Sequence, residues 1–272
     1  MPATPDKTES RGYIIPMGGE VEKFEQPRIL ERFFELSGGS DANILVIPTA
    51  SELSETGPGY VELFESMGGR SRFIPVDKRE DCFDEEIQQA LNEASSIFIT
   101  GGNQLRLSTI LGGTPVAKLI RSLNASGVHV AGTSAGAAIM SEHMIAGGPG
   151  GPTPRENGVT MAPGLGLTNK IIIDQHFSQR DRIGRLMTAL SYNPFVSGIG
   201  IDENTAAFID ANGMLEVLGE GAVTVLDPAE LSHSSMANTR ADEPITLIGM
   251  KIHVLASGAQ FNIETRKAYS LK

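Results

Sequence analysis

Cysteine and basic residues are scarce in this 272-residue chain, and each scarcity excludes a class of protein. The single cysteine, Cys82, rules out an intrachain disulfide, which is typical of proteins from a reducing compartment. Acidic neighbours on both sides disfavour the thiolate of Cys82, so we expect no nucleophile there. Lys and Arg number 22 against 33 Asp and Glu, and the net charge of −11 argues against a nucleic-acid-binding surface.

Long apolar runs are absent as well. No stretch approaches the ~20 apolar residues that cross a membrane. Residues 1–11 are polar and lack the apolar core of a signal peptide. We therefore expect a cytoplasmic protein without membrane contacts, built as a flexible N-terminal tail over residues 1–11 and a single α/β domain over residues 12–272.

Signatures of metal and nucleotide sites are also missing. Neither H-E-x-x-H nor C-x-x-C occurs. No glycine pattern matches the dinucleotide-binding fingerprint or a Walker loop. The sequence therefore predicts neither a metal site nor a nucleotide cofactor.

The chain does contain a regular alternation of short apolar runs and amphipathic stretches. The apolar runs are continuous, which is typical of strands buried on both faces in a parallel sheet. Strands are expected over residues 13–15, 43–47, 73–76, 96–99, 128–131 and 170–174. Helices are expected over residues 27–35, 59–67, 83–94, 115–123 and 179–192. This order predicts an α/β fold with a doubly wound, mostly parallel sheet, whose sites form beyond the carboxyl ends of the strands.

After residue 200 the pattern changes to C-terminal β-hairpins. Asn212-Gly213, a strong tight-turn signal, separates strand candidates over residues 207–210 and 214–217. Further strands are expected over residues 222–226 and 245–254. The Gly/Pro-rich stretch 147–154 lies within the α/β pattern, so we interpret it as a surface loop.

A lone serine stands between two glycines in Gly132-Thr133-Ser134-Ala135-Gly136, where an apolar run ends and helix-forming residues begin. A nucleophile on such a turn projects from the sheet edge, because glycines let the backbone crowd through the turn. The free N–H groups of the following helix then face the serine and stabilise charge on an attacked carbonyl. Taken alone, these five residues fit an anion-binding turn equally well.

A serine nucleophile needs a base, and the base needs an acid that orients it. Of the five histidines, His176 is the one that lies just past a predicted central strand, where a site belongs. Asp202 and Glu203 follow another apolar run, and either is a candidate acid. The chain order serine, histidine, acid differs from the order in α/β-hydrolases and disfavours that fold.

Two backbone amides are candidates for an oxyanion hole. Ala135 follows the serine directly, and Gly102 closes the Gly101-Gly102 pair at the end of another predicted strand. A plain tight turn explains Gly101-Gly102 at least as well. For the Gly18-Gly19 pair after the first strand we expect only a turn.

These residues belong to motifs spread over nearly the whole chain beyond its N-terminal tail. The motifs are TGGNQLRL at 100–107, AGTSAGA at 131–137, MIAGG at 144–148, DQHF at 174–177 and GIDE at 200–203. On these motifs the chain resembles the serine peptidase family that contains cyanophycinases and aspartyl dipeptidases (dipeptidase E).

The resemblance implies a class I glutaminase-like fold in which serine replaces the cysteine nucleophile. It implies a homodimeric exopeptidase without a cofactor, which cleaves cyanophycin into β-aspartyl-arginine dipeptides. Cyanophycin is a polyaspartate in which each aspartate carries an arginine on its β-carboxyl. The family's nucleophile, base and acid fall on Ser134, His176 and Glu203. Its substrate-binding residues fall on Gln104, Asp174, Gln175, Arg180, Arg182 and Arg185.

The chemistry of the three arginines agrees with this substrate. Arg182 and Arg185 are three residues apart and share a face of the expected helix. Arginine grips carboxylates with a planar fork, and each branch of the polymer ends in a free α-carboxylate. Without the resemblance, a solvated basic helix face is the preferred explanation of the cluster. Two other functions stay open, an α-aspartyl dipeptidase and a catalytically inactive binding module on the same scaffold.

Overall fold

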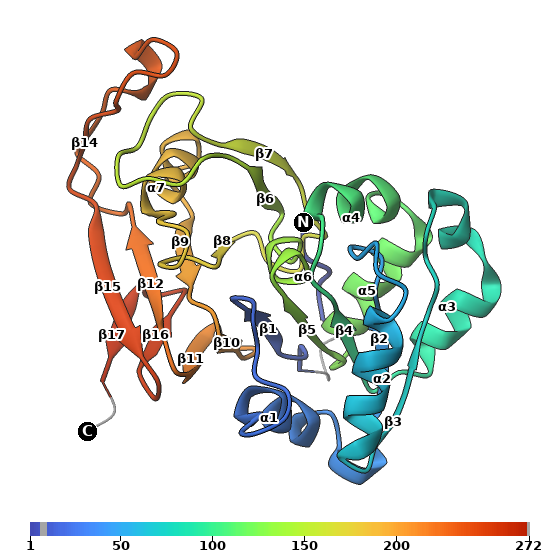
Figure 1. Cartoon of the computed structure of the whole chain (residues 1–272). Helices are drawn as coiled ribbons and strands as arrows, with labels where there is room; N and C mark the ends of the chain where they lie inside the picture. The colour runs from blue at the N-terminus through green and yellow to red at the C-terminus, as the bar shows by residue number, and fades with distance from the viewer. Residues whose placement is uncertain (6–9, 271–272) are drawn as a thin grey trace.

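Parallel strands form the centre of the larger sheet. The structure is a computed structural model that describes residues 1–5 and 10–270. In a nine-stranded sheet, β1, β5, β4, β2 and β3 lie side by side in that order and run parallel (Figure 1). Their bounds are Ile14–Met17 (β1), Asn43–Ile47 (β2), Arg70–Phe73 (β3), Ser96–Ile99 (β4) and His129–Thr133 (β5).

Helices cover both faces of this parallel region. Ile44 and Val46 of β2 belong to an apolar cluster with α1 and α2, whereas Leu45 and Ile47 belong to a second cluster with α3, α4 and α5. Successive side chains of a strand point to opposite faces, so the two clusters lie on opposite sides of the sheet. The helices are Arg28–Leu36 (α1), Thr56–Ser66 (α2), Glu85–Asn92 (α3), Gln104–Leu111 (α4) and Pro115–Ala125 (α5). The predicted doubly wound α/β class is confirmed.

Antiparallel strands extend the sheet beyond β1. They follow in the order β10, β11, β16 and β17, and the predicted Asn212-Gly213 turn joins the first two. Gly213 has φ +75°, a conformation that suits glycine in a tight hairpin. The bounds are Thr205–Ile209 (β10), Met214–Gly219 (β11), Gln260–Asn262 (β16) and Lys267–Tyr269 (β17).

A second, four-stranded sheet has the order β15-β12-β9-β8, with only β8 and β9 parallel. Helix α7 packs on it through Leu186, Ala189 and Leu190. Two ribbons, β6–β7 and β13–β14, complete the strand pairing (Figure 1). The bounds are Ile171–Gln175 (β8), Ile183–Tyr192 (α7), Ser197–Ile201 (β9), Ala222–Asp227 (β12), Lys251–Ala256 (β15), His143–Gly147 (β6), Thr160–Pro163 (β7), His233–Ser234 (β13) and Leu247–Ile248 (β14).

Several expected elements differ in extent or place. The strand expected at 73–76 lies at 70–73. The helix expected at 83–94 is α3, Glu85–Asn92, which a separate 3-10 helix, Arg79–Phe83, precedes. Helix α4 was not expected; it is capped by Asn103, whose side chain accepts the N–H groups of Leu105 and Arg106. The strand expected at 170–174 is β8, which belongs to the second sheet. The strand expected at 245–254 is divided into β14 and β15 by Gly249, whose φ is +93°.

The N-terminal tail was expected to be flexible, and its residues 6–9 lie outside the described residues. The amino group of Met1 lies 3.3 Å from Glu142, and Arg11 donates to the Asn124 side chain at 2.8 Å. Across residues 1–5 and 10–270, no helix combines the length and apolar character needed to cross a membrane.

The turn after β5 passes very close to the end of β4. A Cβ atom on Gly136 would lie 2.1 Å from the carbonyl oxygen of Ile99, and one on Gly132 would lie 2.5 Å from the Gly136 carbonyl oxygen. Only glycine fits such an approach without moving the backbone. Gly132 and Gly136 therefore allow the backbone around Ser134 to pack directly against itself and against the end of β4.

Replacing Gly136 by alanine should destabilise the fold, because the new methyl group meets the Ile99 carbonyl. We expect a loss of about 2 kcal/mol or more in the free energy of unfolding, measured by urea denaturation. Gly147→Ala is the matched control, since its Cβ would meet nothing within 4 Å. Equal stability of Gly136→Ala and Gly147→Ala would contradict this account of the turn.

Candidate active site

Strands from both sheets end at one place, where their following residues meet. Ser134 follows β5 of the larger sheet, His176 follows β8 of the second sheet, and Glu203 lies two residues beyond β9. The His176 N–H donates to the Gly18 carbonyl at 2.7 Å and so joins the end of β8 to the end of β1. The site thus lies at the carboxyl ends of parallel strands, as expected for an α/β fold.

Ser134 occupies a strained turn. Its φ of 52° and ψ of −112° lie in a region that residues with a side chain rarely adopt. Its own N–H donates to the Met17 carbonyl at 3.0 Å, which fixes the turn against β1. The strain is what a sharp strand-to-helix turn needs in order to project the hydroxyl from the sheet edge.

Ser134, His176 and Glu203 form a continuous chain of polar contacts. Ser134 Oγ lies 2.9 Å from His176 Nε2, and His176 Nδ1 lies 2.6 Å from Glu203 Oε1. Both are hydrogen-bond distances. A carboxylate on Nδ1 favours the tautomer whose Nε2 is free to accept the serine proton.

Asp202, the other candidate acid, points elsewhere. Its Oδ1 accepts the Ser178 N–H at 3.0 Å and its Oδ2 accepts the Ala222 N–H at 3.1 Å. Both oxygens are thus engaged by backbone amides that tie neighbouring segments together. The structure thus brings Glu203, the acid that the family resemblance implies, to the histidine.

His176 is nearly enclosed, with 6% of its side chain exposed. Burial lowers the pKa of the imidazole below its ordinary value, and the hydrogen bond to Glu203 acts in the opposite direction. Gly19 packs on the ring, since a Cβ atom there would lie 2.2 Å from His176 Cε1. The histidine is therefore held between a carboxylate and a backbone that cannot carry a side chain.

The two backbone amides that the sequence offers for an oxyanion hole, those of Gly102 and Ala135, have no acceptor within the described residues. Helix α6, Ala135–Ala138, has a single turn. A macrodipole sums over aligned peptides, so this helix offers free N–H groups rather than a large field.

A polar cavity of about 470 Å³ opens beside Ser134 and His176. Five further residues predicted from the sequence line it, namely Gly102, Gln104, Gln175, Arg180 and Arg182. Arg180 is exposed and makes no ion pair within the described part of the chain. Burial and the nearby charge of Arg185 lower the pKa of Arg182 to about 10, so Arg182 stays cationic at neutral pH.

Asp174 and Arg185 lie behind this cavity. They form a buried ion pair in which Arg185 Nε donates to Asp174 Oδ2 at 2.7 Å. Arg182 lies 3.5 Å from Asp174 and donates to the carbonyl of Gln175. Asp174 therefore helps to hold Arg182 in place. Removing one partner of the Asp174–Arg185 pair costs about 3–5 kcal/mol, because the other charge stays buried.

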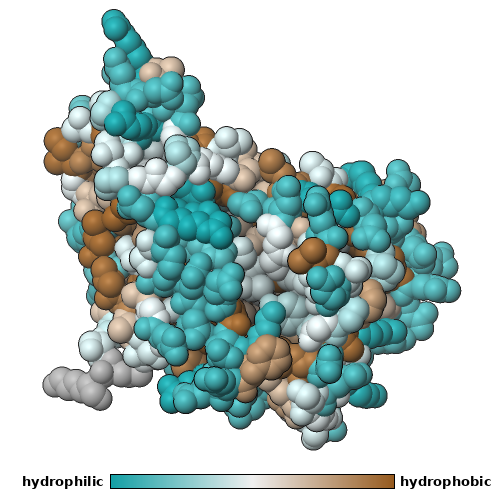
Figure 2. Space-filling model, in the orientation of Figure 1, coloured by the Kyte–Doolittle hydropathy of each residue, from teal (hydrophilic) through white to brown (hydrophobic). Residues whose placement is uncertain are grey.

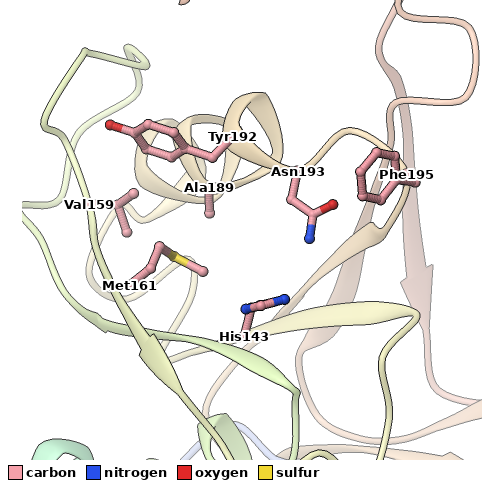
Figure 3. A pocket seen from close by; sticks show the side chains of 7 residues that line it. All are labelled: His143, Val159, Met161, Ala189, Tyr192, Asn193 and Phe195. Carbon is pink, nitrogen blue, oxygen red and sulfur yellow. The ribbon is translucent and has the colours of Figure 1, made fainter. Parts of the chain in front are cut away.

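A second hollow, of about 550 Å³, lies between α7 and the β6–β7 ribbon (Figure 3). Its lining is mainly apolar and includes Met161, Tyr192 and Phe195. No predicted site residue lines it. In residues 1–5 and 10–270, no three His, Cys, Asp or Glu side chains are grouped as a metal site.

Comparison with known proteins agrees with the geometry. The model of peptidase family S51 matches residues 14–217. The chain belongs to this family. It is a serine peptidase, and its relatives include a cyanophycinase of Trichormus variabilis, 42% identical over 97% of this chain and 89% of the relative. A cyanophycinase of Geminocystis herdmanii is 40% identical over 94% of this chain and 96% of that protein.

The fold also resembles that of a solved peptidase structure. A peptidase from an acI-B1 actinobacterium superposes with a TM-score of 0.66 over 89% of this chain and 97% of that chain. The two sequences are 24% identical, so this likeness bears on the fold alone.

Sequence reasoning missed the part that β1 plays in this S51 site. The Gly18-Gly19 pair was expected to be only a turn, yet Gly18 accepts the His176 N–H and Gly19 packs on its ring. Asn204, not singled out either, donates its N–H to the Gly19 carbonyl at 2.9 Å. The available signal was a third glycine pair directly after a buried strand, in the same position as Gly101-Gly102.

Glu203→Gln should lower kcat by about 10⁴-fold, the loss seen when an amide replaces the orienting acid of a serine protease. Asp202→Asn should keep most of the activity of the folded enzyme and lower its thermal stability, because charged acceptors for two backbone amides are lost. Kinetics and thermal unfolding of both variants test the assignment. A deeper catalytic loss in Asp202→Asn at unchanged stability would reverse it.

The acidic limb of kcat/KM should lie below the ordinary histidine pKa. Only neutral His176 accepts the serine proton, and burial keeps the imidazole neutral to lower pH. In Glu203→Gln the residual activity should persist to still lower pH, since the carboxylate that raises this pKa is gone. If the acidic limb of the parent enzyme's pH profile lay above the ordinary histidine pKa, this account of His176 would be wrong.

Proposed function

We propose that this chain is an exopeptidase that hydrolyses the polyaspartate backbone of cyanophycin and releases β-aspartyl-arginine dipeptides. The observation that carries the proposal is the contact of Ser134 with His176, 2.9 Å apart, at the mouth of a cavity lined by two arginines. The similarity to named cyanophycinases over nearly the whole chain supports the same substrate.

The reaction follows from the geometry. Ser134 Oγ attacks the scissile carbonyl while His176 Nε2 takes its proton, and Glu203 stabilises the imidazolium through Nδ1. The free N–H groups of Gly102 and Ala135 are assigned to the carbonyl oxygen as it becomes negative. His176 then gives the proton to the leaving amine, and water hydrolyses the acyl-enzyme by the same steps.

The cavity suits a substrate rich in carboxylates. Arg180 is exposed and Arg182 is held in place, so both can receive the α-carboxylates of the arginine branches. Gln104 and Gln175 are assigned to substrate contacts in the same cavity. Asp174 and Arg185 then serve substrate binding indirectly, through the position of Arg182.

The alternatives have less support. An α-aspartyl dipeptidase needs recognition of a free N-terminal aspartate and has little use for two arginines beside the nucleophile. An inactive binding module does not need Ser134, His176 and Glu203 within hydrogen-bond distance of one another. We keep both as outcomes of the experiment below.

A homodimer and a cytoplasmic location remain proposals. The free edge of β15 supports the first, because its Ile252 and Val254 are 49% and 70% exposed, and exposed apolar edge strands pair readily. Figure 2 shows apolar surface on the side where Figure 1 draws β15 and β17. The lone cysteine, Cys82, supports a reducing compartment.

The decisive measurement is mass spectrometry of the products released from purified cyanophycin. We expect β-aspartyl-arginine from the parent protein and no product from Ser134→Ala, whose fold should persist, since only a hydroxyl is removed. Hydrolysis of Asp-Xaa dipeptides with cyanophycin untouched would favour the dipeptidase. Product from Ser134→Ala would remove Ser134 from its role.

A further inference from the structure

The cationic residues of the cavity match only one end of the proposed substrate. Arg180, Arg182 and Lys23 line the cavity and suit carboxylates. Each branch of cyanophycin also ends in a guanidinium, which needs acceptors. Of the residues lining this cavity in the described part of the chain, Glu20 is the only one with a carboxylate.

Glu20 is held at a fixed place beside the base. It follows Gly19, which packs on the His176 ring, and its φ of 44° is rare for a residue with a side chain. Asn204 fixes both sides of this position, since its N–H donates to the Gly19 carbonyl at 2.9 Å and its Oδ1 accepts the Glu22 N–H at 3.0 Å. A left-handed glutamate maintained by its neighbours is typical of a functional position.

The Glu20 carboxylate is exposed and has no partner of its own. Across the described residues, no hydrogen bond or ion pair engages its side chain. Its negative charge reaches the inner wall of the cavity, where burial and Glu20 together raise the pKa of Tyr60 to about 12. Lys23 already makes a cation–π contact with the Tyr60 ring, with Nζ 4.5 Å from the ring centroid. The ring is therefore occupied, and a bound guanidinium pairs with the Glu20 carboxylate instead.

A second acceptor in the same cavity also lacks a donor. Gln175 is 2% exposed, and its Oε1 is buried with no hydrogen-bond partner. An unpaired buried oxygen is costly, so a ligand that donates to it gains affinity. A guanidinium presents five N–H donors in one plane and can serve more than one acceptor at once.

We propose that Glu20 is the specificity residue for the branch of the substrate and pairs its carboxylate with the arginine guanidinium, while Gln175 Oε1 accepts a further N–H of the bound substrate. This assignment rests on the proposed function. Arg180 and Arg182 then bind the carboxylate end of a branch and Glu20 binds its cationic end, so a branch must carry both charges to be held.

The test pairs Glu20→Gln with a substrate in which citrulline replaces arginine. Citrulline keeps the shape of the branch and removes its charge. We expect Glu20→Gln to raise KM for the arginine-bearing substrate by about 10-fold, with kcat within about 2-fold. Citrulline should cost the parent enzyme a similar factor, and it should cost Glu20→Gln almost nothing more, because the two changes remove the same contact.

The matched control is Glu25→Gln, which removes an exposed carboxylate of the same segment that does not line the cavity. Its KM should equal that of the parent on both substrates. If Glu20→Gln folds poorly, Glu20→Asn removes the charge with a residue type that tolerates left-handed φ. Equal losses for Glu20→Gln on both substrates would overturn the pairing, whereas a parent enzyme inactive on the arginine-bearing substrate would overturn the proposed function instead.

Discussion

The hydrogen bond from the His176 amide to the Gly18 carbonyl joins the two sheets, and the catalytic geometry depends on it. Ser134 belongs to the larger sheet, whereas His176 and Glu203 belong to the second. Their spacing is therefore set by how the two sheets meet. The place where the two sheets meet is called the seam below. Two further backbone hydrogen bonds lie there, from the Gly18 N–H to the Thr205 carbonyl and from the Asn204 N–H to the Gly19 carbonyl, so the ends of β1, β8, β9 and β10 form one unit.

Backbone strain gathers at the same seam. Glu20, Ser134, His176 and Asn204 all have positive φ without being glycine. Each such residue costs about 1–3 kcal/mol, and it persists only where its surroundings determine it. The strain is offset by hydrogen bonds across the seam and by the two apolar clusters beneath it. Some free energy of folding is thereby lost at the positions where the backbone orients the side chains of the site.

Much of this arrangement follows from local sequence. Continuous apolar runs such as 43–47 and 96–99, set between amphipathic stretches, are typical of strands covered on both faces, so the parallel region and most of its helices could be predicted. Ser134 and His176 were within reach because each follows such a run. The division into two sheets could not be predicted. The sequence of β8 has the same apolar pattern as the other buried strands, and only contacts distant in the sequence determine its partner strand. The choice of Glu203 over Asp202 and the burial of Asp174 depend on those contacts too.

The seam is built from main-chain groups, and this has a consequence for how the protein can diverge. A peptide N–H or carbonyl is the same in nearly every residue type, so mutation can change side chains along β1, β8 and β9 without altering how the sheets are joined. A residue larger than glycine does not fit at Gly18 or Gly19. A Cβ atom at Gly18 would lie 2.0 Å from the Asp202 carbonyl oxygen, and one at Gly19 would lie 2.2 Å from the His176 ring. These two positions without side chains thus keep the base in register with the end of β1.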